Sequence, residues 1–169
     1  MIIKRLHSDM SSECKYSFLE AKSKLEFLCA YQERCSSELE KKLYDWGIYK
    51  EDADRLLAHL ISNNYLNEER FAEAFVSGKV NIKKWGRIKI RQHLKQKRIS
   101  DYSIKKGLAS IDEVAYYSNL EHLANKKWNS LSREKNSYQK KVKVYRLLSS
   151  KGYENDLLRD VVDEIAAEQ

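Results

Sequence analysis

Apolar residues recur along this chain with the three- and four-residue spacing of amphipathic helices. The same order of positions appears three times: two apolar residues four apart, a turn residue followed by an apolar one, and a second helical run. The three copies begin at Leu39, Ile90 and Val144. Each copy therefore predicts two helices joined by a tight turn.

The turn residue of each copy indicates how its first helix ends. Gly47 and Gly152 occupy this position in the first and third copies, and Arg98 occupies it in the second. A residue in the left-handed conformation commonly ends a helix, and glycine adopts it most easily. A non-glycine residue adopts it at modest strain cost. We therefore expect the same turn in all three copies.

A further helical stretch precedes each pair, at residues 17–33, 67–82 and 112–131. The sequence Ser37-x-x-Glu40 has the spacing of a capping box at a helix start. Asn67, followed by two glutamates, places an amide cap and acidic charge at another start.

Together these patterns predict an all-α protein of nine helices, built as three tandem three-helix modules. Modules that contact mainly their neighbours stack into an elongated, curved, repeat-like body. We place the modules at residues 17–65, 66–111 and 112–169. Residues 1–16 have no such partner, and we expect them to be loose or strand-like.

The composition supports this class and narrows the setting. The 169 residues contain no proline and only five glycines, which argues against the many tight turns of an all-β fold. The apolar fraction of 42% suffices for a core. No apolar run approaches 18 residues, so we expect neither a membrane span nor a signal peptide. Three cysteines without CxxC spacing suggest a reducing cytoplasm.

The net charge of +7 is concentrated in the middle of the chain. Residues 74–100 contain no acid, and on one continuous helix several of their bases fall within about 80° of one another. Such a stripe attracts polyanions, although a solvated face is the alternative. The candidate DNA- or filament-binding residues are Lys83, Lys84, Arg87, Arg91, Lys95, Lys97 and Arg98.

Two expectations follow from this stripe. Replacing Arg87, Arg91 and Lys95 together with alanine should weaken binding to DNA and leave the fold intact. Trp85, which lies among the cations, is a candidate for stacking on unpaired bases, with a core position as the alternative.

The two ends of the third module differ in charge. A second acid-free stretch, residues 135–153, carries lysines, Arg146 and tyrosines that include Tyr138 and Tyr145, whereas the final helix is acidic. Opposite charges in neighbouring segments favour a protein that docks on a large, unevenly charged partner.

The sequence contains no recognisable catalytic, metal or cofactor motif. The four histidines are far apart, and neither a phosphate-binding loop nor a dinucleotide-binding motif occurs. We therefore expect a protein that is not an enzyme, binds no metal and needs no cofactor.

Three segments, in order, resemble the RecX family. Residues 37–43 with Trp46-Gly47-Ile48 match its Ser-x-x-Glu-Leu-x-x-Lys-Leu-x-x-x-Gly segment, residues 65–76 match its Gly-Tyr-Leu-Asn-Asp-Glu-Arg-Phe-Ala segment, and residues 86–99 match its basic Ile-x-x-x-Leu-x-x-Lys-Gly-Ile segment. The resemblance covers residues 25–111, and the repeats extend it to about 165. Asn64 and Arg98 stand where the family has glycine.

The resemblance implies a regulator of the RecA recombinase. Such a protein binds RecA and the RecA–DNA filament, and it limits filament extension, strand exchange and ATP hydrolysis in DNA repair, homologous recombination and the SOS response. We expect a cytoplasmic monomer with possible direct contact to DNA. The alternative is a helical protein that binds DNA on its own.

Overall fold

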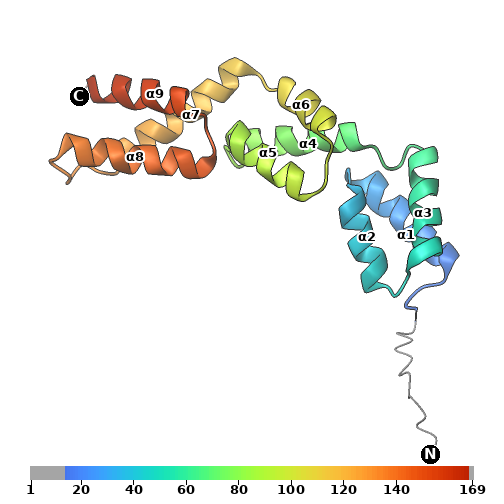
Figure 1. Ribbon diagram of the computed structural model, residues 1–169. Coiled ribbons are helices and arrows are strands. Elements are labelled where there is room, and N and C mark those ends of the chain that lie inside the picture. The colour runs from blue at the N-terminus through green and yellow to red at the C-terminus, as the bar shows by residue number, and fades with distance from the viewer. Residues whose placement is uncertain (1–13, 168–169) are drawn as a thin grey trace, which may run out of the picture. The chain divides into compact units, whose positions relative to one another are not determined.

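The computed structural model describes residues 14–167, and every regular element in this range is a helix. These helices are labelled in Figure 1. In chain order they are α1 (Phe18–Tyr31), α2 (Ser36–Asp45), α3 (Lys50–Ser62), α4 (Glu68–Asn81), α5 (Arg87–Gln96), α6 (Asp101–Ala109), α7 (Glu113–Asn129), α8 (Ser137–Lys151) and α9 (Asn155–Ala167). The prediction of an all-α chain of three-helix repeats is confirmed for these residues.

The chain divides into two compact units, residues 1–67 and 68–169. The first contains α1–α3, and the second contains α4–α6 followed by α7–α9. The module boundaries at 65/66 and 111/112 stay predictions. Residues 1–13, which carry most of the expectation for a loose N-terminal segment, lie outside the described residues.

The first described residues are held against the first unit. The Lys15 N–H donates to the Trp46 carbonyl at 2.9 Å, and the Tyr16 ring meets Trp46 edge to face at 5.1 Å. The core of this unit is the cluster Ala21, Leu25, Cys29, Leu39, Leu43, Ile48, Leu56, Leu60 and Leu66. Its apolar positions on α2 and α3 are those of the predicted repeat.

One predicted helix start is wrong. Helix α2 begins at Ser36 with Cys35 as its N-cap, and no side chain caps it. Cys35 is 1% exposed, so burial of this residue sets the helix start and places Ser37 inside the first turn. A capping box forms instead at α1, where Ser17 and Glu20 exchange hydrogen bonds.

The predicted helix ends are confirmed. Gly47, Arg98 and Gly152 have φ angles of 76°, 61° and 85°. After each of them, the next N–H donates to a carbonyl five residues back: Ile48 to Leu43, Ile99 to Leu94 and Tyr153 to Leu148. This is the Schellman arrangement, in which both residues of the pair are apolar and buried.

Asn64, like Arg98, replaces a family glycine and keeps its backbone conformation. Its φ angle is 58°, and the following Tyr65 N–H donates to the Leu60 carbonyl at 2.8 Å. Asparagine tolerates this region better than most residues. The buried apolar residues around the turn therefore maintain the geometry without glycine.

In the second unit, the end of α8 meets the start of α5. The Gly86 N–H donates to the Lys151 carbonyl at 2.8 Å, and the Ile88 N–H donates to the Gly152 carbonyl at 3.0 Å. Between them, the Arg87 N–H donates to the Tyr116 hydroxyl at 2.9 Å. The first N–H groups of a helix and the last carbonyls of a helix lack partners within their own helix, so each end here satisfies the other.

This junction leaves no room for side chains at either glycine. A Cβ on Gly86 would lie 2.1 Å from the Gly152 carbonyl oxygen, and a Cβ on Gly152 would lie 2.3 Å from the Lys89 Cβ. Because the first obstacle is backbone, no side-chain movement relieves it.

We therefore predict that Gly86→Ala lowers the free energy of unfolding by about 2 to 4 kcal/mol, through overpacking and weakened hydrogen bonds. Urea unfolding followed by circular dichroism measures this. The control is Gly78→Ala in α4, where a Cβ meets nothing within 4 Å. That change should be neutral or stabilising by about 0.5–1 kcal/mol. Equal effects of the two substitutions would contradict the role of this junction.

Candidate nucleic-acid interface

The proposed basic stripe centres on α5, but only part of it lies on that helix. Arg87, Arg91 and Lys95 are four residues apart within α5. Lys83 and Lys84 precede the helix, where Lys84 has a φ of 53°. Lys97 is the C-cap residue, and Arg98 is the left-handed residue that follows.

The projection of these bases onto one continuous helix therefore does not hold for Lys83 and Lys84, which precede α5, or for Arg98, which follows it. Gly86 is extended, with φ −81° and ψ 163°, because it caps α5 while pairing with the end of α8.

Arg87 is used within the fold. Its guanidinium donates to Glu154 at 2.9 Å and to Glu113 at 2.5 Å, and it lies 4.2 Å from the centre of the Tyr116 ring. The Tyr116 hydroxyl also donates to Glu154, at 2.7 Å. Burial, followed by this carboxylate, raises the pKa of Tyr116 well above its usual range. Arg87 thus ties α5 to the start of α7 and to the turn between α8 and α9.

The other candidate residues differ in the contacts that their side chains make within the fold. Lys95 pairs with Asp101 at 3.3 Å in an exposed contact of small energy. Lys97 lies 5.9 Å from the centre of the Phe71 ring. Arg91 is exposed and makes no ion pair within the part of the chain that the structure describes. Residues 74–100 contain no acid, but Asp101, Glu113 and Glu154 from other parts of the fold pair with their cations.

A second group of cations surrounds Trp85. Lys79 and Lys89 lie over its ring at 5.2 and 4.8 Å, and the His93 ring lies at 4.6 Å with a 31° tilt. Because these groups cover Trp85, it is a packing residue in this arrangement rather than an open stacking platform. The site prediction omitted Lys79, Lys89 and His93, although the four-residue spacing of Lys89 and His93 places them on one face of α5.

Burial and the lysines around the Trp85 ring change the pKa of His93. Partial burial, with Lys89, Lys79 and Lys97 nearby, lowers the pKa of His93 below its ordinary value. The lowered pKa favours the neutral imidazole, so the lysines are the cations of this group. A positive potential attracts phosphate groups without selecting a base.

Residues 14–167 contain neither a metal-binding cluster nor a membrane-spanning helix. No group of three His, Cys, Asp or Glu residues in this range is placed to hold a metal ion. None of its helices is both long and apolar enough to cross a membrane.

Known proteins share this sequence and fold. The family model described as RecX, second three-helix domain, matches residues 67–108, and that described as RecX, third three-helix domain, matches residues 115–162. The chain belongs to the RecX family.

Individual relatives agree with this assignment. Regulatory protein RecX of Clostridium botulinum (strain Eklund 17B / Type B) is 35% identical over 132 residues, covering 78% of this chain and 61% of the relative. The corresponding protein of Clostridioides difficile (strain 630) is 27% identical over 153 residues, covering 88% and 69%. The match thus spans less than two thirds of the Clostridium botulinum RecX.

Two solved RecX structures have the same fold. A crystal structure of regulatory protein RecX gives a TM-score of 0.77 at 25% identity, covering 86% of this chain and 73% of that one. RecX from Lactobacillus salivarius gives 0.76 at 23% identity, covering 87% and 95%.

The ion pairs of Arg87 generate a prediction about stability. Arg87→Ala should lower the free energy of unfolding by about 1 to 3 kcal/mol, because it removes the cation that pairs with Glu154 and leaves only the Tyr116 hydroxyl donating to this carboxylate. The matched change Arg91→Ala, on the exposed face of the same helix, should stay within about 0.5 kcal/mol. Thermal or urea unfolding compares them. Equal stabilities would show that Arg87 is dispensable to the fold, as the sequence suggested.

The lysines around Trp85 generate a prediction about pH. An NMR titration should find the pKa of His93 below 6.5, and Lys89→Ala should raise it. Because the unfolded chain takes up this proton at higher pH than the folded chain, stability should fall as the pH drops below about 6.5 and level off below the folded-state pKa. A single-stranded oligonucleotide should raise the pKa of His93, since its phosphates offset the lysine charges. A pKa at or above 6.5 in the free protein would contradict this environment.

Proposed function

We propose that this chain binds the RecA recombinase and the RecA–DNA filament and limits filament extension, strand exchange and ATP hydrolysis. Membership of the RecX family carries the proposal, since the matched relatives bear the name regulatory protein RecX. The chain acts in this role by binding, as a cytoplasmic monomer, in DNA repair, recombination and the SOS response.

The distribution of cations around α5 supports contact with the DNA of the filament. Lys83, which precedes α5, and Arg91, within α5, are exposed, and Lys84, Lys95, Lys97 and Arg98 belong to the same basic region of the sequence. Arg87 is left out of the contact set, since its guanidinium is held by two carboxylates. Phosphate contacts of this kind position a protein on DNA of any sequence, as a filament regulator requires.

The central test is inhibition of RecA. The purified protein should lower the DNA-dependent ATPase and strand exchange of RecA at substoichiometric ratios. The double change Arg91→Ala and Lys95→Ala should weaken this inhibition several-fold. It should also change the salt dependence of filament binding. In a plot of log affinity against log salt concentration, the slope should become shallower by about one unit for each phosphate that the variant no longer neutralises.

The control variant carries Lys126→Ala and Arg133→Ala, which remove the same charge from exposed positions outside α5. It should inhibit like the unaltered protein. Absence of inhibition at equimolar protein would overturn the RecA role. Tight, salt-dependent DNA binding without any effect on RecA would instead support a protein that binds DNA on its own.

A further inference from the structure

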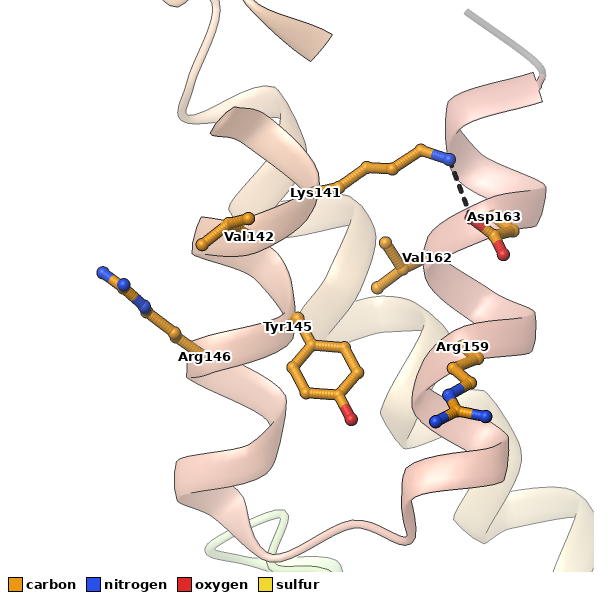
Figure 2. Close-up of a pocket in the computed structure, with 7 residues that line it drawn as sticks. All are labelled: Lys141, Val142, Tyr145, Arg146, Arg159, Val162 and Asp163. Atoms are coloured by element: carbon orange, nitrogen blue, oxygen red, sulfur yellow. Dashed lines mark hydrogen bonds and ion pairs between the residues drawn. The ribbon is translucent and has the colours of Figure 1, made fainter. Parts of the chain in front are cut away.

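A pocket of about 330 Å³ opens between α8 and α9, in the last three-helix group. Its lining side chains are drawn in Figure 2. Val142 and Tyr145 come from α8, and Val162 comes from α9. These three give the pocket an apolar surface, and its size lies at the lower end for pockets that take small ligands or single side chains.

The apolar surface of the pocket is held in place by the fold. Val162 is 5% exposed and belongs to the core. The Tyr145 ring lies between the two helices (Figure 2), and its hydroxyl donates to the Asn155 side chain at 3.1 Å. Since one edge of the ring is tied to the start of α9, the pocket is formed before any partner binds.

The rim of the pocket is basic. Lys141 donates to Asp163 at 2.7 Å across one end. Arg146 and Arg159 are exposed, and neither makes an ion pair with any residue between 14 and 167. In Figure 2 Arg159 projects from α9 near the Tyr145 ring, and Arg146 projects from α8 on the side away from α9. Three cations and one acid therefore border an apolar surface, and arginine recognises carboxylates through paired hydrogen bonds.

The acidic residues of α9 help to decide which class of molecule fits. Asp156, Asp160, Asp163 and Glu164 are exposed on this helix. Of these, Asp163 lines the pocket. A nucleic-acid strand carries a negative charge at every phosphate, so a strand along the pocket would run beside Asp163 and within the negative potential of this acidic helix. A peptide places its few carboxylates at separate points and fills an apolar pocket with one side chain. The arrangement therefore favours a peptide.

We propose that the α8–α9 pocket binds a protein segment that inserts one bulky apolar side chain between Tyr145, Val142 and Val162 and presents carboxylates to Arg146 and Arg159. This inference rests on the proposed function, under which the segment belongs to RecA. The pocket is then the protein-binding surface of the regulator, and the basic region around α5 is its DNA-binding surface.

The test separates binding to RecA from binding to DNA. One variant carries Arg146→Ala and Arg159→Ala, and a second carries Val142→Asp, which places a charge on the apolar surface. The control is again Lys126→Ala with Arg133→Ala, which removes as much charge as the arginine pair. Circular dichroism and thermal unfolding establish that each variant is folded. Each is then sedimented with RecA–DNA filaments and, separately, titrated with a labelled single-stranded oligonucleotide.

Both pocket variants should bind filaments at least about tenfold more weakly than the control while keeping its oligonucleotide affinity. Filament binding equal to that of the control would overturn the pocket and leave the proposed function in place. Equal weakening for filament and oligonucleotide would show that the pocket takes nucleic acid. If the unaltered protein bound no filament, the proposed function would be overturned. RecA would then also be excluded as the source of the bound segment.

Discussion

The second unit depends on the meeting of two helix ends. The last carbonyls of α8 accept hydrogen bonds from the first N–H groups of α5, so two sets of backbone groups that helices normally leave open satisfy each other. The helix dipoles favour the same arrangement, because the positive start of one helix faces the negative end of the other. Backbone can approach backbone this closely only because Gly86 and Gly152 have no side chains.

This junction also determines which cations remain available. It brings Glu154, just after α8, and Glu113, at the start of α7, to Arg87. A residue that looks like the centre of a basic stripe thereby becomes a link between helices. The positive potential around α5 is left to cations such as Arg91 and to the lysines around Trp85. Charge counted along the sequence and charge arranged in space differ here because the neutralising acids lie 26 and 67 residues away.

The helices and their ends could be predicted because their causes are local. Spacing of apolar residues located the repeats, and the left-handed turn at Arg98 followed from the buried pair Leu94 and Ile99 that the glycine copies share. The start of α2 could not be predicted, since burial of Cys35 overrides the Ser37 cap. Nor could the role of Arg87 or the pocket beside Tyr145, because both depend on which surfaces meet after folding.

The same junction relates the two proposed surfaces to each other. The basic region begins at the residues flanking Gly86, and the turn that holds Gly86 also joins the two helices that form the pocket. A partner bound between α8 and α9 would therefore lie near the turn whose carbonyls accept hydrogen bonds from the start of α5. A filament that offers DNA and protein together can engage both surfaces at once, and the second contact is then intramolecular and gains from a high effective concentration. Neither DNA alone nor RecA alone would provide that gain, so under the two proposals the chain would favour the assembled filament over its separate components.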